Sequence, residues 1–253
     1  MSKILTTHVG SLPRSKGLSE ILFSKDRGEK FIKEDFNNIL KKNVETIVKK
    51  QIEVGIDYIS DGEMSKISYA TYIKDRIDGF SGESERRAPA DLDDFPEYKE
   101  KIAKSGGTPT YSRPCCTNAL KIKDKDSLNK DLENFKNSLD KNNHQKAFMN
   151  AASPGVINVF MPNRFYKTDD EYLHKLSEIM AIEYETITKS NIQVQLDCPD
   201  LALARHMNFK ELSEQEFLKR AEIQIECLNE ALTNVDVNTV SYTHLRAHET
   251  SPY

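Results

Sequence analysis

One stretch decides the fold: Gln193-Val-Gln-Leu-Asp-Cys-Pro-Asp-Leu-Ala-Leu-Ala-Arg-His206. Its apolar start predicts a short strand, which ends just before Pro199 because proline has no N–H to donate to a sheet. The loop that follows carries further polar side chains, namely Asp200, Arg205 and His206. A carboxylate such as Asp197 at the last residue of a buried strand is typical of the catalytic end of an α/β barrel.

The same layout occurs twice earlier in the chain. Residues 4–9 predict a strand that ends in Gly10-Ser-Leu-Pro-Arg14, and residues 57–60 predict one that ends in Asp61-Gly-Glu-Met-Ser-Lys66. In both cases a glycine lets the backbone turn tightly where polar side chains gather. These strand ends supply further candidate site residues, namely His8, Ser11, Arg14, Asp61, Glu63 and Lys66.

The rest of the chain alternates between the two kinds of element. Residues 112–120 and 147–152 predict strands, and helical spacing of apolar residues predicts helices over 34–54, 127–139, 169–189 and 215–232. Residues 69–114 are interpreted as an insertion at the top of a barrel, and the insertion is expected to begin with a short helix over 69–80. Strands that alternate with helices favour a parallel α/β sheet.

The totals exclude several classes of partner. A formal charge of −4 over 253 residues gives no basic surface for nucleic acid or for an anionic membrane. No apolar run is long enough to cross a bilayer, and the first residues lack the apolar core of a signal peptide, so we expect a cytoplasmic protein. The four cysteines form no C-x-x-C pair, which indicates reduced thiols rather than disulfides or a zinc knuckle.

The last residues break the alternation. A strand is due after the helix over 215–232, but residues 240–250 have neither a period of 2 nor one of 3.6. The segment resembles the translation of a sequencing-library adapter. We therefore expect residues 1–239 to form a partial barrel domain and residues 240–253 to be a non-native tail, and the nucleotide sequence of the gene tests this boundary.

Three motifs stand at strand ends in a fixed order: Thr6-Thr-His-Val-Gly-Ser-Leu-Pro-Arg14, Gly55-Ile-Asp-Tyr-Ile-Ser-Asp-Gly-Glu-Met-Ser-Lys66 and Val194-Gln-Leu-Asp-Cys-Pro-Asp-Leu-Ala-Leu-Ala-Arg-His206. Together they resemble the catalytic barrel of the cobalamin-independent methionine synthase family. The shorter, single-barrel branch of that family is more similar still, since it also shows pieces such as Asp94-Phe-Pro-Glu-Tyr98, Arg113-Pro-Cys-Cys-Thr117 and Ser153-Pro-Gly155.

The resemblance implies a (β/α)8 TIM barrel, of which about five βα units are present here. It also implies a reaction in which zinc activates the thiol of homocysteine, which then takes a methyl group from a methyltetrahydrofolate-type donor to form methionine. A thiol needs such help because only the thiolate is a good nucleophile. By the motif matches, Ser11 would meet the carboxylate of the amino acid, and Glu63 and Asp197 would hold its ammonium group.

The zinc ligands of the family include a His-x-Cys motif on the strand after residue 232, a later Glu and a last Cys. No cysteine stands two residues after His244 or His248, so we expect the ligands beyond residue 239 and outside this chain. The chain as given is then expected to hold no metal ligand and no catalytic residue, and to be inactive.

The other candidates have structural alternatives. Asp61 could simply form the turn before Gly62, and His8 could be a structural histidine. Arg14 is assigned to the substrate site with Ser11, whereas Arg205 and His206 could bind a folate tail or only hold loops together. Lys66 and Tyr69 are candidates for contacts to an anionic second substrate. Small, buried apolar side chains are expected at the cysteines, namely Cys115, Cys116 and Cys227, and Cys198 could face the site.

Two other functions stay open. One is a related zinc-dependent thiol alkyltransferase, similar to those that open epoxides with coenzyme M. The other is a barrel that binds amino acids or thiols without chemistry. Fold and motifs alone do not separate these, because function depends on the details of the pocket. Small-molecule substrates are the expected partners, and the sequence does not predict the oligomeric state.

Overall fold

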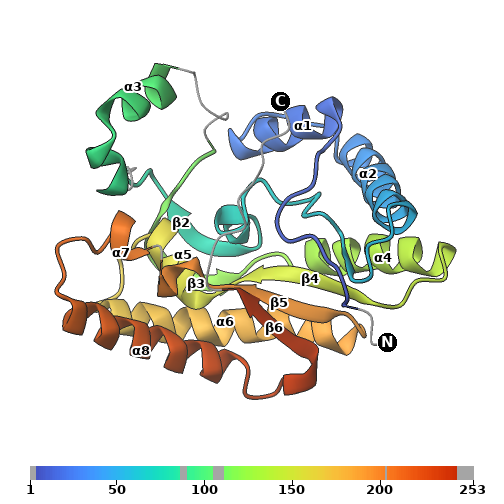
Figure 1. Cartoon of the computed structure of the whole chain (residues 1–253). Coiled ribbons are helices and arrows are strands. Elements are labelled where there is room, and N and C mark those ends of the chain that lie inside the picture. The colour runs from blue at the N-terminus through green and yellow to red at the C-terminus, as the bar shows by residue number, and fades with distance from the viewer. Residues whose placement is uncertain (1–3, 86–89, 105–110, 203, 244–253) are drawn as a thin grey trace.

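A parallel sheet organises the computed structural model, which describes residues 4–85, 90–104, 111–202 and 204–243 (Figure 1). Its strand order is β1–β4–β5–β6. These strands are β1 (Ile59–Ser60), β4 (Ala147–Ala152), β5 (Gln193–Asp197) and β6 (Val240–Thr243). Every pair in the sheet is parallel, so all the carboxyl ends lie at one edge.

A long helix precedes each strand of this sheet. The helices are α2 (Lys33–Glu53), α4 (Asp126–Lys141), α6 (Asp169–Lys189) and α8 (Glu214–Ala231). Because α2 packs on α4, α4 on α6 and α6 on α8, the helices follow the same order as their strands. This is the arrangement of a βα barrel along part of its circumference, and it confirms the predicted α/β class. The expected helices over 34–54, 127–139, 169–189 and 215–232 are confirmed to within a few residues.

The predicted strand over residues 4–9 is wrong in length. Only Thr7 pairs, in an isolated parallel bridge with Tyr58. The reason is local competition for hydrogen bonds, because the Asp57 carboxylate accepts the backbone N–H of Thr6 at 2.9 Å and its hydroxyl at 3.0 Å. Those groups are therefore not available to extend a ladder.

The region over residues 69–114 also differs from expectation. In place of one helix over 69–80 there is a short 3₁₀ helix, η1 (Thr71–Asp75), followed by β2 (Ile77–Ser81). The predicted third strand exists as β3 (Cys115–Ile122), but it pairs antiparallel with β2 and lies outside the parallel sheet. Beyond β2 come η2 (Ala90–Asp94) and α3 (Pro96–Lys104).

The stretch expected to be irregular near the end of the chain begins with a strand. Residues 240–243 form β6, which pairs in register with residues 194–197 of β5. A strand therefore follows α8, as the alternation of strands and helices requires. The expected domain boundary at residue 239 stays a prediction, and residues 244–253, which include His244 and His248, lie outside the described residues.

The core lies between the sheet and its helices. Among its largest fully buried side chains are Tyr172 and Tyr184 of α6 and Phe135 of α4. All four cysteines are buried and free, as expected for Cys115, Cys116 and Cys227. The remaining elements are α1 (Lys16–Asp26), α5 (Pro154–Phe160), η3 (Pro199–Leu201), α7 (Ala204–Met207) and η4 (Val237–Thr239). Within the described ranges, no helix has the length and apolar character needed to pass through a bilayer.

Candidate functional site

Polar side chains meet where the parallel strands end. The residue pairs Ser60–Phe148 and Ala152–Asp197 are in register, so the loops after β1, β4 and β5 leave the same edge of the sheet. Five residues from this edge and from the N-terminal loop form what we call the strand-end cluster. Its members are Ser11, Glu63, Lys66, Asn150 and Asp197.

The first half of the strand-end cluster is built on a strained turn. Glu63 has a φ of +55°, a backbone conformation that is uncommon outside glycine. Arg14 stabilises this turn, because its Nη2 donates to the carbonyl oxygens of Glu63 and Lys66 at 2.7 Å each. The Oγ of Ser11 donates to Oε2 of Glu63 at 2.6 Å. The structure thus brings Ser11, Arg14 and Glu63 together.

The Glu63 carboxyl group is left half satisfied. Its side chain is 1% exposed, and its Oε1 has no hydrogen-bond partner. Burial raises the pKa of Glu63, and the charge of Lys66 and the Ser11 hydroxyl oppose that rise. A buried carboxylate oxygen without a donor is costly, so this position favours a ligand that brings an N–H group.

Lys66 and Asn150 connect Glu63 with Asp197. The ammonium group of Lys66 donates to the backbone carbonyl of Asn150 and lies 4.3 Å from the centre of the Tyr72 ring. The side-chain amide of Asn150 donates to the Asp197 carboxylate at 3.2 Å. Like Glu63, Asn150 keeps one buried oxygen, Oδ1, without a partner. The cluster therefore contains two acceptors that lack donors.

Asp61 acts within the turn itself. Its Oδ1 accepts the backbone N–H of Glu63 at 3.0 Å, and the side chain is 2% exposed. The geometry is that of a residue that shapes the loop, which is the structural alternative that the sequence offered. Asp61 also contributes to the raised pKa of Glu63, because the two carboxyl groups repel each other.

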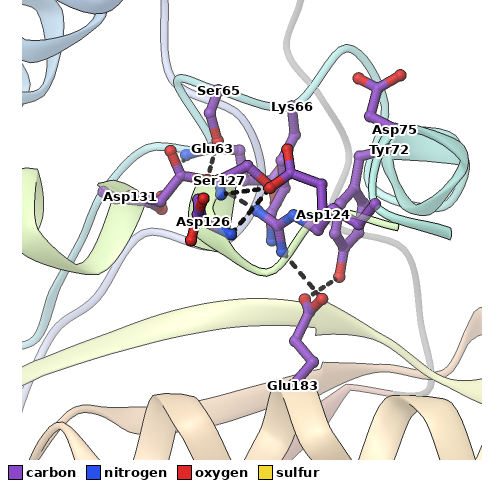
Figure 2. Close-up of polar contacts among 12 residues, drawn as sticks. Glu63, Ser65, Lys66, Tyr72, Asp75, Asp124, Asp126, Ser127, Asp131 and Glu183 are labelled. Carbon is purple, nitrogen blue, oxygen red and sulfur yellow. Dashed lines mark hydrogen bonds and ion pairs between the residues drawn. The ribbon is translucent and has the colours of Figure 1, made fainter. Parts of the chain in front are cut away.

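A buried ionic network lies beside the strand-end cluster (Figure 2). The Arg76 guanidinium donates to Glu183 of α6 at 2.9 Å and to Asp131 of α4 at 2.8 Å. The Tyr72 hydroxyl donates to the same Glu183 carboxylate at 2.5 Å, and the Ser65 hydroxyl donates to Asp131 at 2.8 Å. Since Ser65 and Tyr72 flank Lys66 in the chain, this network fixes the loop that carries Lys66.

Asp200 lies in the loop after β5 and faces the end of β4. It accepts the Ser153 hydroxyl at 2.8 Å and is 2% exposed. Burial raises the pKa of Asp200 to about 6, against which the Ser153 hydrogen bond acts. Its neighbour Cys198 is buried, and burial raises the pKa of that thiol far above the ordinary value. The Sγ of Cys198 lies 3.8 Å from the Leu196 carbonyl oxygen.

The structure does not bring all the expected residues to this place. His206 is exposed on α7 and makes no hydrogen bond to the strand-end cluster, all of which lies in the described part of the chain. Arg205 lies 5.8 Å from the Phe217 ring of α8. His8 is half-buried, and its Nε2 has no partner. Sequence reasoning missed Asn150, although a single amide in an otherwise apolar buried strand is a signal of function.

A cleft of about 290 Å³ opens at the rim, between α5, α8 and the segments around β2 and β3. Arginine is prominent in its lining, which includes Arg113, Asn158, Phe160, Arg164, Asp169 and Arg220. The Nε atoms of Arg113 and Arg220 are buried and have no partner. The centre of the Phe160 ring lies 4.5 Å from Cζ of Arg113 and 5.5 Å from the centre of the Tyr69 ring. These contacts connect the cleft with the loop after β1.

The chain is similar to known proteins along most of its length. Residues 4–88 match the family model described as the catalytic domain of cobalamin-independent synthase. The methionine synthase of Sulfolobus acidocaldarius is 26% identical over 250 residues, which cover 96% of this chain and 63% of that protein. The chain thus spans somewhat less than two thirds of the length of this curated relative.

Solved structures share the fold. A B12-independent methionine synthase from Shewanella sp. W3-18-1, in complex with selenomethionine, has a TM-score of 0.63 at 15% identity over 91% of this chain and 58% of its own. A Listeria monocytogenes protein assigned as a vitamin-B12-independent methionine synthase has a TM-score of 0.64 at 16% identity over 95% of this chain and 66% of its own. These likenesses confirm the expected TIM-barrel architecture. Together with the sequence matches, they show that the chain is similar to cobalamin-independent methionine synthases and shares their fold.

Proposed function

We propose that this protein transfers a methyl group to the thiol of homocysteine and so forms methionine. The observation that carries the proposal is the unpartnered, buried Oε1 of Glu63. The matched relatives are methionine synthases, and one of the structural neighbours was solved with selenomethionine, an analogue of the product.

The strand-end cluster accounts for recognition of an amino acid. The ammonium group of homocysteine would donate to Glu63 and Asp197, which are both carboxylates at strand ends. The Ser11 hydroxyl, which now donates to Glu63, could instead donate to the carboxylate of the ligand once the ammonium group satisfies Glu63. Lys66 would limit the repulsion between the two buried carboxylates, because its charge already opposes the rise that burial causes in the pKa of Glu63.

The cluster discriminates between the candidate thiols. Coenzyme M carries a sulfonate and no ammonium group, so it would leave the Glu63 oxygen without a donor and bring a second negative charge nearby. Homocysteine supplies the missing donor. The charge of the cluster therefore favours homocysteine over coenzyme M as the acceptor.

The donor remains a proposal of the methyltetrahydrofolate type. Its anionic portion would bind in the rim cleft, where Arg113 and Arg220 present N–H groups without acceptors. Arg205 and His206, which both belong to α7, stay candidates for contacts to the same donor, since Met207 at the end of α7 lines the cleft. Arg113→Gln is then expected to weaken binding of the donor and to leave homocysteine binding unchanged.

The proposal for the whole protein includes zinc, which would supply the thiolate form of the acceptor. The described residues of the strand-end cluster offer carboxylate, amide, ammonium and hydroxyl groups, but no set of thiolate and imidazole ligands. Cys198 is a single thiol and does not by itself complete such a set. We therefore assign the cluster to substrate binding.

Calorimetry tests the assignment. Glu63→Gln and Asp197→Asn are each expected to weaken homocysteine binding by about tenfold or more, because each removes a charge-assisted hydrogen bond. The matched control is Glu133→Gln, an exposed carboxylate on α4 that pairs with Lys130. Unchanged affinity in both site variants, with thermal unfolding like that of the wild type, would contradict the assignment. Methionine formation from homocysteine and methyltetrahydrofolate distinguishes the enzyme from a barrel that only binds.

A further inference from the structure

Three potential metal ligands meet on the outside of the molecule, between α6 and α8. His174 belongs to α6, whereas Cys227 and Glu230 belong to α8. The ligand atoms of these residues all lie within 4.8 Å of one another. The Nδ1 of His174 is 2.7 Å from Oε2 of Glu230 and 3.7 Å from Sγ of Cys227. The strand-end cluster does not include any of them.

These distances are close to those of a tetrahedral site. Zinc–ligand bonds of about 2.0–2.3 Å place two ligand atoms about 3.5 Å apart. The separation of Sγ and Nδ1 already has nearly this value, and the His174–Glu230 pair needs to open by less than about 1 Å. Cys227 and Glu230 are three residues apart, so they lie on the same face of α8. Small side-chain rotations would therefore complete the geometry.

Burial fixes one ligand and leaves the other two reachable. Cys227 is fully buried where α8 packs on α6, whereas the side chains of His174 and Glu230 are 50% and 52% exposed. Solvent can therefore deliver an ion to the exposed pair, and the thiol lies directly beneath. Figure 1 shows α6 and α8 side by side along the outer edge of the fold.

The local field attracts a cation. A carboxylate oxygen of Glu230 lies within 4.8 Å of the Cys227 thiol, and Glu226 is the residue before Cys227 in α8, so the surroundings of the thiol are acidic. An exposed His–Glu pair adds little to stability on its own, and it does not offset the negative field around the thiol. A divalent ion offsets that field, and its binding releases the thiol proton to solvent.

We propose that His174, Cys227 and Glu230 form a binding site for a zinc-type divalent ion that links α6 to α8. A thiolate and an imidazole select zinc or cobalt over magnesium or calcium, which prefer oxygen ligands. Three protein ligands leave the fourth position to water. The site is structural and lies apart from the residues assigned to homocysteine.

Cobalt titration of the metal-free 253-residue chain tests the site. Cobalt bound to a thiolate gives a charge-transfer absorption band in the near ultraviolet, and we expect that band to saturate at one ion per chain. Cys227→Ser should abolish the band, and His174→Ala and Glu230→Gln should each weaken binding by about tenfold or more. The matched controls are Cys115→Ser, another buried cysteine, and Glu222→Gln, an exposed carboxylate of α8. Both should keep the band and the affinity of the wild type.

Two further readouts keep the test decisive. Zinc should raise the melting temperature of the wild type and of both controls, and should raise that of His174→Ala by less at the same zinc concentration, because only bound metal stabilises the folded state. His174 and Glu230 are half exposed, so their variants are expected to fold even where Cys227→Ser does not. The proposal is overturned by a cobalt band that persists in Cys227→Ser, by equal affinities in all variants, or by the absence of any thiolate band in the wild type.

Discussion

Replacing Asp200 with asparagine should stabilise the protein at neutral pH and leave its stability at pH 4 nearly unchanged. The aspartate is 2% exposed and accepts a hydrogen bond from Ser153 at 2.8 Å. Asparagine has the same shape and keeps an oxygen for that hydrogen bond, but it cannot ionise. The substitution therefore removes only the cost of a buried negative charge.

The magnitude follows from the pKa of Asp200, which burial raises from 3.8 to about 6. A raised pKa means that, between about pH 4 and pH 6, the folded protein keeps a proton that the unfolded chain has lost. The free energy of unfolding therefore falls as the pH rises, and the fall is complete above the folded-state pKa. A shift of about two units corresponds to about 3 kcal/mol, which sets the largest gain expected for Asp200→Asn above pH 7.

Urea unfolding followed by circular dichroism, at pH values between 4 and 8, measures this effect. The informative quantity is the difference in unfolding free energy between variant and wild type, because the other titrating groups largely cancel. That difference should be close to zero at pH 4 and rise through pH 6 to a plateau. The control is Asp140→Asn, because Asp140 is an exposed residue of α4. Its difference in unfolding free energy from the wild type should not rise between pH 4 and pH 6. The reasoning would be refuted if the difference in unfolding free energy between Asp200→Asn and the wild type did not change with pH. It would also be refuted if the variant were less stable than the wild type at pH 8.

Three other perturbations test the packing and charge around the same edge. Gly155→Ala would place a Cβ 2.0 Å from Oδ2 of Asp200, so we expect a loss of about 1–3 kcal/mol in urea unfolding, which a second Asp200→Ala substitution should partly restore. Arg76→Met leaves the buried carboxylates of Asp131 and Glu183 without their counter-charge and should lower the free energy of unfolding by about 3–5 kcal/mol. A melting temperature like that of the wild type would argue against the network. Because burial raises the pKa of Glu63, homocysteine affinity should increase with pH until that carboxyl group is ionised, and calorimetry of Glu63→Gln should show this dependence lost.

The sequence predicted the long helices and two of the sheet strands well because their signals are local. The helix expected over residues 169–189 is α6, which buries one apolar side and begins at a Thr168 cap whose hydroxyl accepts the N–H of Glu171 at 3.1 Å. Strand β4 is also found where it was predicted, over residues 147–152, because all six of its residues are buried. Periodicity and capping depend only on neighbours in the chain, so sequence alone exposes them.

Strand partners depend on contacts that are distant in the sequence, and there the predictions were wrong. Residues 115–122 form a strand, but their pattern does not reveal that β2 is the partner or that the pairing is antiparallel. The helix expected over residues 69–80 was wrong, because most of strand β2 (residues 77–81) falls within it. In the structure Gly79 has a φ of +110°, and a Cβ there would lie 2.8 Å from the Asn118 carbonyl. The register also shifts at this point, as expected of a β-bulge.

The sequence identified the residue types of the candidate site, but function depends on which atoms remain unpaired. Ser11, Glu63 and Asp197 were predicted from their positions at strand ends, whereas the connection through Lys66 and Asn150 joins segments 84 and 47 residues apart in the chain. Burying an amide or a carboxylate is costly unless each oxygen finds a donor. Ser11 satisfies one oxygen of Glu63 and the other has no donor, whereas Asn150 donates its amide N–H to Asp197 and its single side-chain oxygen has no donor. Both unpaired oxygens lower the stability of the fold, so selection for stability alone would remove them. A ligand that donates several N–H groups is the simplest reason for these two acceptors to persist at this edge of the sheet.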